Sequence, residues 1–219
     1  MADMPKSPRF PPKPAVVEIV AFPGVQLLDV AGPLQVFATA NDYAARAGGV
    51  RPYAPRVVSQ NREVTASAGL PMRVSPLSNP MSEVDTLLIA GGPGVQQASN
   101  DAKLVHWVKA RAARARRVTS VCTGAFLLGA TGMLDGRRVA THWTECGRLA
   151  QRFPKIRVEP DPIFIREGNV WTSAGVTAGI DLALALVEED LGRGLALSVA
   201  RHLARHRISR RRPGGGGDH

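Results

Sequence analysis

The sequence predicts an α/β fold in which a mainly parallel sheet is sandwiched between helices. Short apolar, β-rich runs alternate with helical patterns along the chain, as in right-handed βαβ crossovers. The run DTLLIAGG, residues 85–92, is almost continuously apolar, as a parallel strand covered on both faces requires. The run VTAGIDLALALVEEDLG, residues 176–192, is apolar nearly all round, which predicts a buried helix.

The individual elements are predicted from local patterns. Apolar runs bounded by turn residues predict strands at 15–22, 54–60, 85–91 and 117–121. Helical spacing of apolar residues predicts helices at 32–46, 101–115, 124–132, 143–153 and 176–192. Pro33 suits the first turn of the first of these helices. Hairpins are predicted within 63–77 and 161–175, the second turning at Glu167-Gly168-Asn169.

Length and composition favour one globular domain. The 219 residues are 44% hydrophobic and 21% charged, which is enough apolar content for a core. We expect a disordered Pro-rich arm at 1–14, a domain at 15–206, and a basic, Gly-rich tail or truncated linker at 207–219. No apolar run approaches the roughly 18 residues of a membrane helix, and the arm lacks the apolar segment of a signal peptide. Two cysteines argue against a disulfide framework, so we expect a cytoplasmic protein without membrane contact.

The net charge of +10 is concentrated in two segments. Residues 191–219 carry +6 and the run KARAARARR, residues 109–117, carries +5, so the rest is nearly neutral. We interpret both segments as solvated, Arg-rich surface. A basic tail also binds phosphate backbones without sequence preference, so any DNA binding by this chain is expected to be weak and to use the tail.

The stretch VTSVCTGAFLLG, residues 118–129, changes from a strand to a helix within one residue, and Cys122 lies at the change. A sharp turn of this kind pushes its residue out of the sheet into an uncommon φ/ψ region, and Gly124 lets the helix pack closely behind it. The helix N-terminus would lower the pKa of the thiol. The alternative is an inert, buried cysteine.

Two other segments bear on Cys122. Asp29 is a lone carboxylate in the apolar stretch PGVQLLDVAGPLQVF, where the alternative role is a helix cap. The run LIAGGPG, residues 88–94, ends a strand in glycines whose N–H groups can approach a ligand oxygen. Because that run lacks a GK[ST] sequence and the dinucleotide spacing, nucleotide binding is disfavoured. We also predict no cofactor and no metal.

The remaining candidates are weaker. We interpret His142, in the sequence ATHW, as a packed core residue, with a place in a ligand pocket as the alternative. Cys146 is interpreted as structural. His202 and His206 lie one helical turn apart, but on a basic face and without a third ligand, so we expect a solvated face.

The segments LLDVAGP, LIAGGPG, VCTGAFLLGATGMLDGRRVATHW and WTSAGVTAGIDLALALVEEDLG, in this order, resemble the ThiJ/PfpI superfamily, with its flavodoxin-like, class I glutamine amidotransferase-like fold. The resemblance covers about residues 15–205 and is closest to the amidase-like sensor domain of AraC-family transcriptional regulators, then to isocyanide hydratase. It implies that Cys122 is the elbow nucleophile and Asp29 its acidic neighbour. It further implies that Thr123, Gly91 and Gly92 form an oxyanion or ligand-binding site, and that the protein is a homodimer.

The departures from the family pattern bear on function. Peptidase-like members carry His directly after the cysteine, where this chain has Thr123, and the segment TSAGVTAGID lacks the later His of glutamine amidotransferases. A Cys–His dyad is therefore not expected and peptidase activity is disfavoured. The Cys–Asp pair of isocyanide hydratase is retained. In that arrangement Asp29 would hold a proton, Cys122 would be a thiolate, and Cys122 would be alkylated faster than Cys146 near neutral pH.

We therefore expect the ligand-sensing, amidase-like domain of an AraC-family regulator, which binds a small molecule that the sequence does not identify. Too few residues follow the last predicted helix for a helix-turn-helix, so we expect the DNA-binding domain to be missing from this chain. The alternative is a stand-alone cysteine-dependent enzyme of the isocyanide hydratase or amidase type. A third alternative is a scaffold that keeps the fold without a function.

Overall fold

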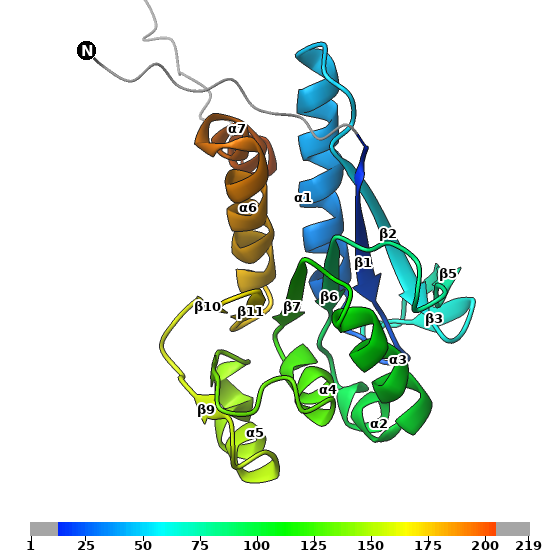
Figure 1. Cartoon of the computed structure of the whole chain (residues 1–219), viewed down its shortest axis with the longest axis vertical. Helices are drawn as coiled ribbons and strands as arrows, with labels where there is room; N and C mark the ends of the chain where they lie inside the picture. The colour runs from blue at the N-terminus through cyan, green and yellow to red at the C-terminus, as the bar shows by residue number, and fades with distance from the viewer. Residues whose placement is uncertain (1–12, 205–219) are drawn as a thin grey trace, which may run out of the picture.

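A computed structural model describes residues 13–204, which form the predicted α/β sandwich (Figure 1). The central sheet has seven strands in the order β10-β11-β7-β6-β1-β2-β5. Its parallel centre comprises β1 (Ala15–Val20), β2 (Tyr53–Ser59), β6 (Thr86–Ile89) and β7 (Arg117–Val121). These four strands confirm the predicted ones. The parts of the arm and the basic tail that lie at 1–12 and 205–219, with His206, are outside the described residues.

The two predicted hairpins are present. The first consists of β3 (Glu63–Thr65) and β4 (Pro71–Arg73), after which β5 (Ser75–Pro76) joins the main sheet beside β2. The second consists of β10 (Phe164–Glu167) and β11 (Val170–Ser173), which are antiparallel to each other, while β11 pairs in parallel with β7. The sheet is therefore parallel except at the β10 edge.

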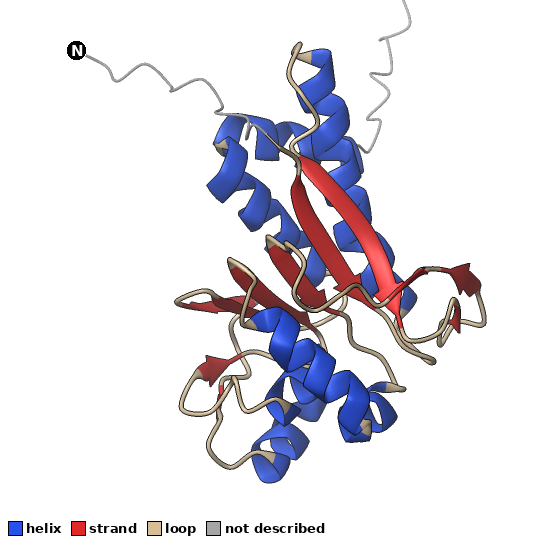
Figure 2. Cartoon of the chain, turned by 45° about the vertical axis from the view of Figure 1, so that its right-hand side comes forward, coloured by secondary structure: helices blue, strands red, loops and turns tan. Residues whose placement is uncertain are grey.

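Helices cover both faces of the sheet (Figure 2). On one face α1 (Leu27–Arg46), α6 (Ala178–Leu191) and α7 (Arg193–Ala204) contact one another. The other face carries α2 (Val95–Asn100), α3 (Ala102–Ala112) and α4 (Gly124–Ala130). A smaller unit extends beyond this second layer and contains β8 (Arg138–Val139), the 3-10 turn Trp143–Glu145, α5 (Cys146–Arg152) and β9 (Arg157–Val158). No helix within residues 13–204 combines the length and apolar character needed to cross a membrane.

Two helix predictions are corrected. Helix α1 begins at Leu27, so Pro33 lies inside the helix and not in its first turn. The missing N–H of Pro33 deprives the Asp29 carbonyl of its helical partner, but packing of Gly32 against Ile180 of α6 holds the helix together. The predicted helix 101–115 is shorter and is preceded by α2, which the sequence pattern did not indicate. Asp101 separates α2 from α3, because its carboxylate accepts the Lys103 and Leu104 N–H groups and caps α3.

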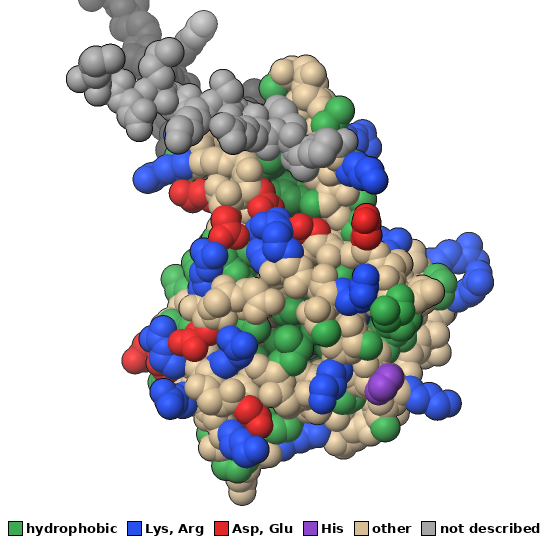
Figure 3. Space-filling view, viewed as in Figure 1, with side chains coloured by type: hydrophobic (Ala, Val, Ile, Leu, Met, Phe, Trp, Pro, Cys, Tyr) green, Lys and Arg blue, Asp and Glu red, His purple; other side chains and the backbone are tan. Residues whose placement is uncertain are grey.

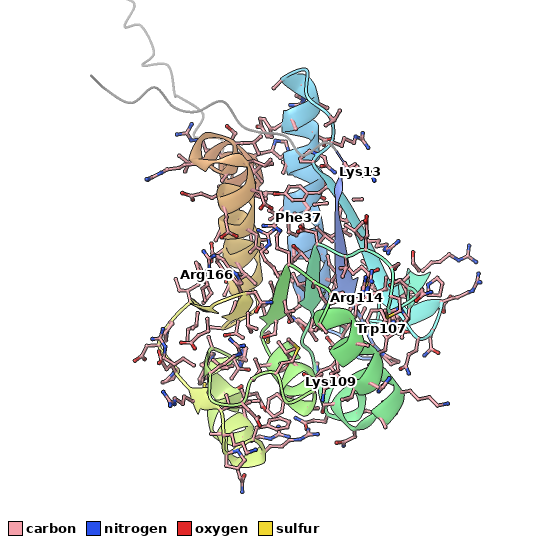
Figure 4. All side chains as sticks on the ribbon, viewed as in Figure 1. Lys13, Phe37, Trp107, Lys109, Arg114 and Arg166 are labelled. Carbon is pink, nitrogen blue, oxygen red and sulfur yellow. The ribbon has the colours of Figure 1, made fainter. Side chains whose placement is uncertain are left out.

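The interpretation of residues 109–117 as a solvated basic surface is wrong for part of the segment. Arg111 is fully buried and its Nε lies 2.6 Å from the equally buried Glu18 carboxylate. Arg117 is 3% exposed and pairs with Asp190 at 2.6 Å. Burial of these guanidinium groups is tolerated because each one is paired and hydrogen-bonded. Lys109 and Arg114, labelled in Figure 4, are exposed members of the segment, and on the face seen in Figure 3 basic side chains are scattered among acidic and apolar ones.

Candidate functional site

Three segments meet at the carboxyl ends of the central strands. Strand β6 ends at Ile89 and leads into Gly91 and Gly92, and β7 ends at Val121, directly before Cys122. The first turn of α1 places Asp29 beside both loops, since the Gly91 N–H donates to Asp29 Oδ2 at 3.0 Å. In a parallel α/β sheet this edge is where ligands bind. The structure therefore brings together the residues that the resemblance implied.

Cys122 has the backbone conformation expected of an elbow. Its φ is 55°, and within residues 13–204 it is alone among non-glycine residues in having a positive φ. Its N–H donates to the Ser173 carbonyl at 3.2 Å, and its own carbonyl accepts the Thr141 hydroxyl at 2.8 Å. Gly124 permits the turn, because a Cβ at that position would lie 2.3 Å from the Ile89 carbonyl oxygen. The sharp strand-to-helix turn predicted from the sequence is thus observed.

Asp29 is a fully buried carboxyl group and not a helix cap. The N-cap of α1 is Gln26, whereas Asp29 lies within the first turn of the helix and is 0% exposed. Its Oδ2 accepts the Gly91 N–H, while its buried Oδ1 has no hydrogen-bond partner among the described residues. A carboxyl group in a dry environment, with a single N–H donor to its oxygens, favours its neutral form.

Thr123 connects the two loops. The Gly92 N–H donates to Thr123 Oγ1 at 2.8 Å, and that hydroxyl lies 3.3 Å from the Gly92 carbonyl. The Gly91 N–H is bonded to Asp29. Both glycine N–H groups expected to face an oxyanion are therefore already bonded within the protein. A ligand oxygen would have to displace Thr123 or Asp29 in order to use them.

Burial dominates the acid–base behaviour of the Cys122–Asp29 pair. Desolvation raises the pKa of Asp29 from 3.8 to about 7, although the Gly91 N–H and the Cys122 thiol act in the opposite direction. Desolvation and the nearby Asp29 charge raise the pKa of Cys122 from 9.0 to about 12, against hydrogen bonds from Thr123 that lower it. The raised pKa of the thiol is the opposite of the lowering expected from the helix N-terminus. The pair then releases its first proton near neutral pH, and the thiol keeps its own.

Cys122 lies at the floor of a cavity of about 500 Å³. Polar side chains of the wall come from separate parts of the chain, namely Gln26, Gln96, His142, Thr144, Glu145 and Arg148. Apolar area is supplied by Pro93, Val95 and Val176. Gln26, Gln96, Glu145 and Arg148 were not predicted, because isolated polar residues outside the core carry no periodicity that sets them apart.

His142 lines this cavity and is half-buried, so its interpretation as a packed core residue is not supported. Its Nδ1 lies 2.8 Å from Thr144 Oγ1, and its ring stacks on Trp143, which is 71% exposed. Within the described part of the chain no hydrogen bond joins a histidine to Cys122.

The other candidates lie away from the thiol. Cys146 is half-buried on α5 and its sulfur lies 3.7 Å from the His142 carbonyl oxygen. His202 is exposed on α7, with its ring centre 6.0 Å from that of Tyr43. Across residues 13–204 no group of three or more His, Cys, Asp or Glu side chains is arranged to hold a metal ion.

Comparisons with known proteins agree with this geometry. The sequence pattern of the DJ-1/PfpI family matches residues 15–189. An isonitrile hydratase from Pseudomonas putida is 35% identical over 178 residues, which cover 80% of this chain and 72% of the hydratase. The HTH-type transcriptional regulator GbdR of Pseudomonas aeruginosa is 31% identical over 147 residues, 67% of this chain but only 40% of the regulator.

Two solved structures show the same fold. A ThiJ/PfpI family protein from Pseudomonas syringae superposes with a TM-score of 0.78 at 27% identity, covering 99% of this chain and 84% of that protein. An AraC family transcriptional regulator from P. putida superposes with a TM-score of 0.72 at 23% identity, covering 87% of this chain and all of that one. The matched unit thus occurs in proteins described as an enzyme and in proteins described as regulators.

Proposed function

Because the chain belongs to the DJ-1/PfpI family, we propose that it is the ligand-sensing domain of an AraC-type regulator and binds a small molecule without transforming it. The observation that carries the proposal is the state of Cys122 at the cavity floor. Burial and the adjacent Asp29 raise the pKa of the thiol to about 12, so the thiolate is scarce at neutral pH. A protonated thiol is a poor nucleophile but an acceptable wall for a bound ligand.

The cavity wall indicates a small, polar ligand. A space of about 500 Å³ lies within the range of small-molecule sites. Glu145 and Arg148 pair with each other at 2.9 Å at the rim, where Arg148 is 60% exposed. An exposed pair of this kind contributes little to stability, so either partner is free to turn towards a ligand group of opposite charge.

Direct binding tests the proposal. Thermal unfolding is followed in a panel of amino acids, amines and short carboxylic acids, and one class should raise the midpoint in a saturable way. The recovered ligand should be chemically unchanged, and Cys122→Ser should still bind it. Arg148→Met should weaken binding, whereas Arg157→Met, a matched change at an exposed site outside the cavity, should not. Consumption of the ligand, or the lack of any stabilising compound, would reject the proposal.

The state of the thiol is tested by alkylation with iodoacetamide. The pKa of Cys122 is raised to about 12, and the pKa of Cys146 is raised by weaker burial alone. Near neutral pH, Cys146 should therefore be alkylated first, in the reverse of the order expected from the sequence. Peptide mass spectrometry on a time course reads out both sites, and faster labelling of Cys122 would show that a thiolate is present.

A second candidate function is hydration of an isonitrile, favoured by the retained Cys122–Asp29 pair. Burial raises the pKa of Asp29 to about 7, so its carboxyl group can both accept and donate a proton near neutral pH. Ionised Asp29 would take the thiol proton as sulfur adds to the terminal carbon of R–N≡C, then deliver it to that carbon, giving R–N=CH–S–Cys122. Water would then add to the same carbon with one proton going to nitrogen. Cleavage of the C–S bond would release R–NH–CHO and restore the thiol.

Loss of the isonitrile infrared band on incubation with the protein tests this second candidate. Cys122→Ser and Asp29→Asn should each abolish turnover, and Cys146→Ser should leave it unchanged, because Cys146 does not line the cavity. Turnover with this pattern would show that the protein hydrates isonitriles, and the proposed ligand-sensing function would be rejected. An intact isonitrile would leave ligand binding as the function of the pocket.

The expected partners and location are also proposals. We propose a homodimer, which light scattering tests, and a cytoplasmic location. We propose further that DNA binding needs a separate domain or relies on the Arg-rich tail. In the second case a mobility-shift assay should show weak binding that is indifferent to sequence and is lost as salt rises. A salt-resistant complex with one operator would contradict this.

A further inference from the structure

We propose that Thr141 is a positioning residue, which holds the left-handed backbone of Cys122 in place and ties that backbone to the rim of the cavity. Thr141 belongs to the ATHW segment, in which the sequence indicated only His142 as a candidate residue. The inference rests on the proposed function in one respect, namely that Cys122 is the centre of the ligand pocket. Thr141 itself does not line the pocket.

Both polar backbone groups of Cys122 are held from outside its own strand and helix. A φ of 55° is disfavoured for a residue with a side chain, so the surroundings must maintain it. The Ser173 carbonyl accepts the Cys122 N–H at 3.2 Å, and the Thr141 hydroxyl donates to the Cys122 carbonyl at 2.8 Å. Thr141 is 0% exposed, so water has no access to replace its hydroxyl.

Thr141 is itself fixed to the strand that holds the other end of Cys122. The N–H of Ala140 donates to Thr172 Oγ1 at 2.9 Å, and Thr172 precedes Ser173 on β11. A closed set of contacts therefore runs from β11 through Ala140 and Thr141 to the Cys122 carbonyl, and back through the Cys122 N–H to β11. No part of this set depends on α4 or on a ligand.

The same segment continues directly into the cavity wall. His142 follows Thr141, and Thr144 and Glu145 follow within three residues, all lining the cavity. A displacement of this wall would pull on the Thr141 hydroxyl, and through it on the Cys122 carbonyl. We call the contacts of Thr141, Thr172 and Ser173 that hold Cys122 the clamp, and through it the rim is connected directly to the backbone of Cys122.

Release of the clamp should let Cys122 relax towards negative φ, which swings its sulfur away from Asp29. The thiol pKa would then fall towards its ordinary value, because the Asp29 charge and the burial that raise it both weaken. In Thr141→Val the hydroxyl is lost at nearly constant volume. The pH midpoint of Cys122 alkylation should move down by about one unit or more, which is about tenfold faster labelling near pH 8.

Three comparisons separate positioning from general damage. Thr141→Ser keeps the hydroxyl and should restore the wild-type pH profile. Thr131→Val removes another buried hydroxyl, which donates to the Leu128 carbonyl at 2.6 Å on α4, and should leave the profile unchanged. Thr172→Val loosens the clamp one step away on a strand that favours valine, and should shift the profile less but in the same direction.

The measurement is iodoacetamide labelling of the full chain across pH, read by peptide mass spectrometry, with Cys146 recorded in the same samples. The inference is overturned if Thr141→Val and Thr172→Val both keep the wild-type profile, if Thr141→Ser fails to restore it, or if Thr131→Val shifts it equally. Equal acceleration at Cys146, which lies beside the His142 carbonyl, would show that the segment unfolds and would also overturn it. Ligand binding is not measured here, so failure of the sensing function leaves this result intact.

Discussion

Replacing Asp29 with Asn should remove a large pH dependence from the stability of this protein. The carboxyl group is 0% exposed, Oδ2 accepts one N–H from Gly91, and Oδ1 has no partner within residues 13–204. Asparagine has the same shape, and its carbonyl oxygen can accept the same N–H. The substitution therefore leaves the packing in place and removes the group that ionises.

The sign and size of this pH dependence follow from the protonated and ionised states of Asp29. Burial raises the pKa of Asp29 from 3.8 to about 7, so between these values the folded protein holds a proton that the unfolded chain has lost. Each rise of one pH unit in this window then lowers the free energy of unfolding by about 1.4 kcal/mol. The full loss, from below the unfolded pKa to above the folded one, is about 4 kcal/mol. Wild type and Asp29→Asn should be of similar stability near pH 4, and the variant should be more stable by up to that amount near pH 8.

Urea unfolding of both proteins at intervals from about pH 4 to about pH 8 measures this difference. Asp42→Asn is the matched control, because Asp42 is an exposed carboxylate on the same helix α1. Its effect should stay within about 0.5 kcal/mol at every pH. If wild type and Asp29→Asn lose stability in parallel as the pH rises, Asp29 is ionised throughout this range and the reasoning is refuted.

Two further pairs of substitutions and one solution measurement test other parts of the structure. Gly124→Ala should lower the free energy of unfolding in urea by about 3 kcal/mol, because its Cβ would lie 2.3 Å from the Ile89 carbonyl oxygen. Gly147→Ala, where a Cβ would meet open space, should instead stabilise α5 by up to about 1 kcal/mol. Arg111→Met should lower the free energy of unfolding by about 3–5 kcal/mol, because the buried Glu18 carboxylate loses its main partner. Arg114→Met, at an exposed site, should change that free energy by no more than about 0.5 kcal/mol. Light scattering at micromolar concentration should give the mass of a homodimer, and a monomer would contradict that expectation.

The sequence predicted the centre of the fold better than its charged parts. The elbow at Cys122 follows from a local pattern, a buried strand that meets a glycine-containing helix start, and the structure confirms it. The burial of Arg111 and Arg117 depends on Glu18 and Asp190, which lie 93 and 73 residues away along the chain. Such partners are found only when the chain is folded, so a run rich in arginine was interpreted as surface.

The candidate site, like the fold, has features that the sequence predicted and features that depend on contacts made only in the folded chain. The proximity of Asp29 to Cys122 was implied by the family resemblance, and the strand ends bring the two residues together. The prior engagement of the Gly91 and Gly92 N–H groups was not predictable, because it depends on the side-chain positions of Asp29 and Thr123. The start of α1 was misplaced because Pro33 usually marks a first turn, and here packing against α6 overrides that preference.

The two margins of the central sheet limit how copies of this chain can meet. At one margin β5 has only two residues, both exposed, and Pro76 lacks the N–H that a further strand would need. At the other margin Arg166 and Glu167 of β10 carry charges that pair with Glu189 and Arg138. Margins of this kind resist the strand-to-strand growth that leads to aggregated protein. Both margins therefore favour contacts through helices or loops over an extension of the sheet from one copy into the next.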